Sequence, residues 1–110
     1  MEIGEEKTEK CVIVSINGRL DTTNYNLLEK KLMELIDGLQ QQILVECSNM
    51  DYVSSSGLRI LLMALKKISQ VNGRFALCGL QENIREIFEI SGFTSIFPIY
   101  TSRDHALATF

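Results

Sequence analysis

The sequence predicts an α/β domain, in which helices pack on a sheet that is at least partly parallel. Three apolar, β-branched runs alternate with three segments whose leucine and isoleucine residues recur at helical spacing, and this alternation is typical of strand–helix–strand units. A chain of 110 residues suits one domain, expected to span residues 1–110, with a core that needs no disulfides. No internal repeat, low-complexity tract or linker interrupts the pattern.

The first part of the chain is predicted to form two strands and a helix. Residues 2–9 alternate weakly and suit an edge strand, whereas the β-branched run CVIVSI at 11–16 suits a buried strand. The polar segment NGRLDTTN at 17–24 is predicted to be a loop. Leucines on one face predict an amphipathic helix from about Tyr25 to Asp37. The residues that could bound this helix are Thr22, Thr23 or Asn24 at its start and Gly38 at its end.

The middle of the chain is predicted to form a second strand and a second helix. The run ILVEC at 43–47 suits a buried strand, and SNMDYV at 48–53 is interpreted as the connection that follows it. The helix after this connection is expected to end near Ser69, before a turn at Asn72 and Gly73. Its predicted buried face consists of Leu58, Leu61, Leu62, Leu65 and Ile68.

The last part of the chain is predicted to contain a strand, a helix and a small terminal unit. RFALCG at 74–79 suits a third strand, and ENIREIFEISG at 82–92 suits a third helix that ends at Gly92. IFPIY at 96–100 is expected to be a short edge segment, since proline is tolerated there. A final helix is expected within residues 102–110, with Ser102 as its N-cap. The third helix is expected to place Ile84, Ile87, Phe88 and Ser91 on one side.

Composition narrows the function classes. The formal net charge is −3, so no basic face is expected for nucleic acid or an anionic membrane. The first ten residues are charged and lack the apolar run of a signal peptide. No apolar stretch is long enough for a membrane span. A cytoplasmic protein is the expectation.

The serine run at 54–56 is the leading candidate for a functional site. Ser54, Ser55 and Ser56 stand where the chain passes into the second predicted helix, and functional groups of open α/β sheets gather at the carboxyl ends of strands. A helix start carries unpaired N–H groups and a partial positive charge, which accommodate a phosphate. A plain N-cap explains one serine, and a local turn explains a second. The third hydroxyl is left without a structural reason.

Catalytic chemistry finds less support in the sequence. S-S-S-G-L is not the G-x-S-x-G of a nucleophile elbow, and no phosphate-binding glycine loop occurs. The only histidine, His105, lies in the predicted terminal helix, where a surface residue is expected. Cys11, Cys47 and Cys78 are odd in number and far apart, which favours buried free thiols over disulfides or a metal site. Neither an enzyme nor a resident cofactor or metal is expected.

Asp21 and Arg59 are secondary candidates. In a parallel sheet, the segment with Asp21 and the serine run could open on the same edge. Capping of the first helix by Asp21, Thr22 and Thr23 is an equally good interpretation, and both roles can hold. Arg59 follows Leu58 on the second helix and is expected to point away from the buried face. A surface arginine without a functional role would be placed in the same way.

Taken together, these segments resemble the STAS domain, specifically the bacterial anti-sigma factor antagonists. Y-V-S-S-S-G-L-R-I-L-L at 52–62 resembles the family signature, and V-S-I-N-G-R-L-D-T-T-N at 14–24 resembles its G-x-L-D turn. I-L-V-E-C-S-N-M-D-Y-V, N-G-R-F-A-L-C-G-L and I-R-E-I-F-E-I-S-G-F also resemble family segments, so the likeness runs from Cys11 to Ala108. It implies one STAS-like domain, a mixed, mostly parallel sheet of four or five strands with about four helices.

The resemblance also implies a site and a function. The family pattern is D-S-S-G-L or D-S-T-G-L, with the first hydroxyl residue phosphorylated, which places the phosphate on Ser55; Ser54 stands where the family has aspartate. Such proteins, while unphosphorylated, bind an anti-sigma factor serine kinase and free the sigma factor. Phosphorylation ends the association, and a metal-dependent serine phosphatase restores it. The partner surface implied here consists of Asp21, Thr22, Ser54, Ser56, Gly57 and Arg59.

Two alternatives remain open at the level of sequence. A stand-alone STAS domain could regulate a partner outside sigma factor control, such as a secretion system or a stress complex. The same loop edge could instead bind a small ligand such as a nucleotide or a lipid.

Overall fold

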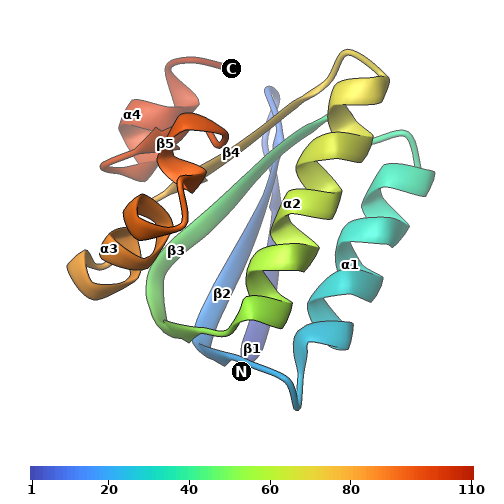
Figure 1. Ribbon diagram of the computed structural model, residues 1–110. Coiled ribbons are helices and arrows are strands. Elements are labelled where there is room, and N and C mark those ends of the chain that lie inside the picture. The colour runs from blue at the N-terminus through green and yellow to red at the C-terminus, as the bar shows by residue number, and fades with distance from the viewer.

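The computed structural model describes residues 1–110 and contains one five-stranded sheet with helices on both faces (Figure 1). The first strand runs antiparallel to the second, and every other pair of neighbours is parallel. The sheet order follows the chain: β1 (Glu2–Lys7), β2 (Val12–Leu20), β3 (Gln42–Val53), β4 (Arg74–Cys78) and β5 (Ile99–Tyr100). The predicted mixed, mostly parallel sheet is confirmed.

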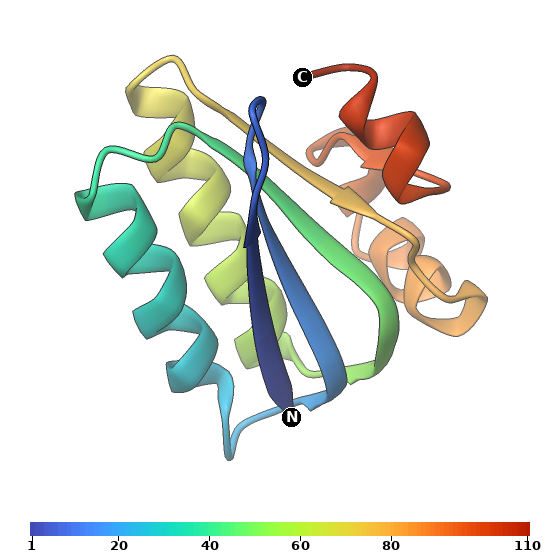
Figure 2. The ribbon, with the colours of Figure 1, turned by 180° about the vertical axis from the view of Figure 1, so that it is seen from behind.

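Four α-helices and one short 3-10 helix surround this sheet. They are α1 (Tyr25–Asp37), α2 (Ser55–Gln70), α3 (Glu82–Ile90), η1 (Phe93–Ser95) and α4 (Arg103–Leu107). Helices α1 and α2 lie side by side on one face of the sheet (Figure 1). The reverse view shows α4 on the other face, beside β4 and β5 (Figure 2). None of the helices is long and apolar enough to cross a membrane.

The core consists of two layers because successive strand side chains point to opposite faces. The larger layer joins β2, β3 and β4 to α1, α2 and α3, and includes Val14, Val45 and Leu61. The smaller layer lies under α4 and includes Ile13, Leu44 and Ala106. No charged side chain is buried. Each face of the sheet therefore packs against helices through apolar side chains, and the charged side chains lie at the surface.

Strands β2 and β3 are longer than the sequence indicated, so the prediction of a loop at 17–20 and a connection at 48–53 was wrong. Asn17 pairs with Asn49, and Leu20 pairs with Val53. Figure 2 shows that α4 lies away from the carboxyl-end extensions of β2 and β3, so one face of these extensions is uncovered and their exposed positions are polar. Irregularities in pairing at Ser15/Asn17 and Gly18/Arg19 break the two-residue alternation, and the left-handed φ of 99° at Gly18 accompanies the second one.

The helices begin and end close to the predicted residues, but the backbone conformation that ends α1 differs from the prediction. Gly38 terminates α1, yet its φ is −81° and the left-handed conformation belongs to Leu39 at φ 67°. Gly92, at φ 77°, follows α3 as a left-handed glycine. Ser102 caps α4 as predicted, because its hydroxyl accepts a hydrogen bond from the His105 N–H at 3.1 Å.

Candidate functional site

The three serines of the run occupy three different environments. Ser54 is the N-cap of α2, and its hydroxyl oxygen accepts a hydrogen bond from the Gly57 N–H at 3.2 Å. Ser55 is the first residue of the helix and is exposed, whereas Ser56 is half-buried. The intramolecular hydrogen bonds of the structure include neither the Ser55 nor the Ser56 hydroxyl. Ser54 therefore provides the structural cap, and Ser55 presents a free hydroxyl to solvent.

Removing the cap should therefore cost stability, whereas removing the free hydroxyl should not. We expect Ser54→Ala to lower the free energy of unfolding by about 1 kcal/mol, because the Gly57 N–H loses its acceptor. Ser55→Ala should change it by less than about 0.5 kcal/mol. Urea unfolding of both variants checks the difference, and a larger loss for Ser55→Ala than for Ser54→Ala would contradict this assignment of the cap.

Gly57 holds the start of α2 against the ends of two strands. A Cβ at this position would lie 2.7 Å from Leu20 Cγ, closer than real side-chain contacts, and 3.1 Å from Val53 Cγ2, which is a tight contact. The Ser54 N–H also donates to the Leu20 carbonyl at 2.9 Å. Gly57 is buried and has no side chain, so its role is in packing rather than in contact with a partner. Its close packing places Ser55 on the rim, at the carboxyl ends of β2 and β3.

The Asp21 segment forms a hydrogen-bonded turn before α1. One carboxylate oxygen of Asp21 accepts bonds from the Thr23 N–H at 2.9 Å and the Thr23 hydroxyl at 2.6 Å. These bonds, together with the Arg19 guanidinium, hold the pKa of the Asp21 carboxyl below its ordinary value. The Asn24 side chain accepts from the Asp21 N–H at 2.9 Å. Asn24 occupies the N-cap position without capping α1, so the predicted side-chain cap by Thr22, Thr23 or Asn24 does not form.

The Asp21 turn and the serine run lie at the same edge of the sheet, as expected. The hydrogen bond between Ser54 and Leu20 joins the two segments directly, and both leave the sheet at the end where α2 begins (Figure 1). Thr22 is exposed and Asp21 is half-buried, while Arg59 is exposed one turn along α2 from Ser55. All the side chains predicted for the site are therefore accessible there, Gly57 being buried beneath them.

Arg19 and Tyr52 also lie at this edge, and the sequence analysis missed both. The Arg19 guanidinium lies 4.1 Å from the centre of the Tyr52 ring, and its Nε is 3.5 Å from an Asp21 carboxylate oxygen. The two residues are direct partners across β2 and β3. The sequence interpretation places both residues in loops rather than in paired strands, and their side-chain chemistry, a guanidinium and a phenol ring, is the only signal of them that the sequence carries.

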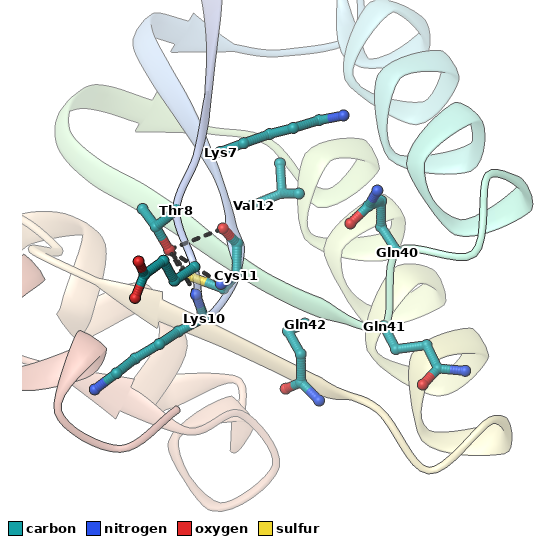
Figure 3. Close-up of a pocket in the computed structure, with 9 residues that line it drawn as sticks. Lys7, Thr8, Lys10, Cys11, Val12, Gln40, Gln41 and Gln42 are labelled. Carbon is teal, nitrogen blue, oxygen red and sulfur yellow. Dashed lines mark hydrogen bonds between the residues drawn. The ribbon is translucent and has the colours of Figure 1, made fainter.

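The hollow shown in Figure 3 lies elsewhere in the molecule. It has a volume of about 140 Å³ and is lined by residues 7–12 and 40–42, around the first residues of β2 and β3. Lys7, Lys10 and the glutamines at 40–42 make its lining polar, and the Thr8 hydroxyl donates to the Cys11 carbonyl at 3.0 Å. The serine run begins at the opposite ends of these strands, so this hollow is separate from the candidate site.

The remaining reactive side chains are the three cysteines and the single histidine. Cys11, Cys47 and Cys78 are buried and unpaired as predicted, and burial raises the pKa of the Cys47 and Cys78 thiols, the latter to about 12. His105 lies on α4, across the sheet from the helix that begins at Ser55 (Figures 1 and 2). No group of three or more His, Cys, Asp or Glu side chains is arranged to hold a metal ion.

Comparison with known proteins connects this arrangement to a family. The sequence model of the STAS domain matches residues 3–106. One relative is BtrV of Bordetella bronchiseptica, which is named as a proposed anti-sigma factor antagonist. It is 37% identical to this chain over 110 residues, which cover 100% of this chain and 95% of BtrV.

Solved structures show the same fold at lower sequence identity. TM1081 of Thermotoga maritima, also proposed to be an anti-sigma factor antagonist, matches with a TM-score of 0.91 at 24% identity, over 97% of this chain and 92% of its own. The unphosphorylated anti-sigma factor antagonist SpoIIAA matches with a TM-score of 0.81 at 20% identity, over 96% and 93% of the two chains. The phosphorylated form of SpoIIAA, a Bacillus protein, matches with a TM-score of 0.77.

Sequence and fold agree in this comparison. The family match covers β2 to β5 in full, all but the first residue of β1 and all but the last residue of α4. The serine run lies within the matched range, at the start of α2. SpoIIAA is an anti-sigma factor antagonist by name, and BtrV and TM1081 carry the same name as a proposed one. This chain belongs to the STAS domain family, within its anti-sigma factor antagonists.

Proposed function

We propose that this chain is a phosphorylatable regulatory protein that, while unphosphorylated, binds an anti-sigma factor serine kinase and thereby frees a sigma factor. Ser55 is the phosphate acceptor in this proposal, and a metal-dependent serine phosphatase restores the binding form. The observation that carries the proposal is the exposed Ser55 hydroxyl, which is free of internal hydrogen bonds at the first position of α2.

A phosphate at this position is compatible with the fold. It carries a charge of about −1.5 to −2 at neutral pH, and the start of α2 has unpaired N–H groups and a partial positive charge. Ser54 supplies the helix cap separately, so modification of Ser55 leaves the cap in place. SpoIIAA has structures in both an unphosphorylated and a phosphorylated form, and both resemble this chain. This supports a switch that changes the surface without refolding the domain.

The proposed partner surface surrounds Ser55. We take it to consist of the predicted residues Asp21, Thr22, Ser54, Ser56 and Arg59, with the predicted Gly57 buried beneath them, and we extend it to Arg19, Tyr52 and Leu27. Leu27 is 54% exposed in the first turn of α1, and Tyr52 is 38% exposed. Arginine and aromatic residues are enriched in protein interfaces. In this proposal, a partner that covers this edge is directly affected by charge added at Ser55.

Incubation with the kinase and ATP, followed by peptide mass spectrometry, tests the proposal. We expect one phosphate, on Ser55, in the native chain, in Ser54→Ala and in Ser56→Ala. Ser55→Ala should remain unmodified and still bind the kinase, because alanine removes only the acceptor hydroxyl. A phosphate on Ser54 or Ser56 of the native chain would refute the assignment, as would failure of Ser55→Ala to bind the kinase.

A further inference from the structure

Arg59 is an unpaired cation on the same face of α2 as Ser55. The two residues are four positions apart and both are exposed, and side chains at this spacing lie next to each other on a helix. The four ion pairs of the structure are Arg19–Asp21, Lys31–Glu5, Arg85–Glu89 and Arg103–Glu6. Arg59 belongs to none of them, so its guanidinium is available.

This face of α2 continues as a basic strip. Arg59, Lys66 and Lys67 line one shallow groove together with Leu62, Met63 and Gln70. None of its three cations has an acidic partner within the chain, although the net charge of the protein is −3. In the unphosphorylated chain, the strip presents positive charge to an approaching protein, beginning one turn from the Ser55 hydroxyl.

We propose that Arg59 captures the phosphate of phosphorylated Ser55 in an intrahelical ion pair. The inference rests on the proposed phosphorylation of Ser55 and adds a second component to the switch. Phosphorylation introduces negative charge at the rim, and the same event withdraws Arg59 from the basic strip. The partner would then face the phosphate on Ser55 and would no longer find the Arg59 guanidinium free to bind it.

The chemistry and direction of the pair both favour its formation. A guanidinium binds phosphate oxygens through two parallel N–H groups, which makes the contact stronger than an ordinary exposed pair. The anion lies on the N-terminal side of the cation, the orientation that suits the helix dipole. Arg19 is already stacked on Tyr52 and paired with Asp21. Of the three unpaired cations on α2, Arg59 is therefore the one within a single helical turn of Ser55.

Titration of phosphoserine by 31P NMR tests the pair without any partner protein. The probe is the full chain with phosphoserine incorporated at position 55 during translation, in the native background and with Arg59→Gln. Pairing with Arg59 favours the dianion and lowers the second pKa of the phosphate. We expect Arg59→Gln to raise that pKa by about 0.3 to 0.5 unit, a two- to threefold change in the acid dissociation constant. The difference should shrink in about 1 M salt, where charges are screened within about 3 Å.

Lys66→Gln is the matched control, since it removes one positive charge from the same helix. It lies eleven residues from position 55 and should leave the pKa of the phosphate unchanged. Other charged groups on the adjoining segments, Arg19, Asp21 and Asp51, are identical in every sample. Circular dichroism confirms that the exposed substitutions leave the chain folded.

The outcomes separate the two proposals. Equal values for the native chain and Arg59→Gln would overturn the ion pair, as would an equal rise with Lys66→Gln. Because the phosphoserine is installed without a kinase, either result leaves the proposed function standing. Failure of the kinase to modify Ser55 would instead overturn the proposed function, whatever the titration shows.

Discussion

Ser55→Asp should weaken binding to the anti-sigma factor kinase roughly a thousandfold, a loss of about 4 kcal/mol, with the fold unchanged. Ser55 is exposed on the rim where α2 leaves the sheet, so a fixed negative charge there meets the partner surface directly. A charge placed against an acidic or closely fitted surface costs several kcal/mol of binding. Isothermal titration calorimetry with the purified kinase measures the affinity, and circular dichroism checks the fold.

Ser55→Asn is the matched control for this prediction, because asparagine has nearly the shape of aspartate without its charge. We expect it to retain most of the native affinity. Equal losses for Ser55→Asp and Ser55→Asn would show that shape rather than charge controls docking. Native affinity in Ser55→Asp would contradict the repulsion mechanism.

Phe88→Ala should lower the free energy of unfolding by about 3 to 5 kcal/mol, the largest stability effect expected in this protein. Phe88 is fully buried, and its ring packs against Phe93 and Phe97 at centroid distances of 6.1 and 5.7 Å. Phe97 in turn contacts Phe75 of β4 at 6.3 Å. The aromatic cluster fastens α3 and η1 to the sheet, and alanine leaves a cavity at its centre. Urea unfolding measures the loss.

Ile90→Ala, at the end of the same helix, is the control because Ile90 is 88% exposed. It should change stability by less than about 0.5 kcal/mol. If Phe88→Ala proves too unstable for a folded baseline, Phe88→Leu should show an intermediate loss. Equal small effects of Phe88→Ala and Ile90→Ala would contradict the position of Phe88 in the core.

The sequence predicted the elements whose buried residues follow one regular period. The leucines of α1 recur at helical spacing, and the predicted range from Tyr25 to Asp37 coincides with the helix. The buried halves of β2 and β3 are apolar at nearly every position, because helices cover both faces of the sheet there. The extensions of these strands were missed because one face is uncovered, so polar residues such as Asn17 and Ser48 resemble loop residues in sequence.

The sequence could predict which segments form the candidate site, but not which contacts its side chains make. Three adjacent serines indicated a special helix start, yet the sequence could not decide which one caps it. That choice depends on the extended backbone at Ser54 and on the close approach of Gly57 to Leu20, both of which are tertiary features. The stacking of Arg19 on Tyr52 depends on strand register, which an interpretation of both segments as loops does not contain.

The central claim is that phosphate on Ser55 changes partner binding without refolding the domain. The most direct test compares the fully phosphorylated and unphosphorylated chains by two-dimensional amide NMR and by titration with the kinase. We predict amide shift changes confined to the start of α2 and the adjoining Asp21 turn, together with loss of kinase binding. Shift changes throughout the sheet, or equal affinity of the two forms for the kinase, would contradict the account.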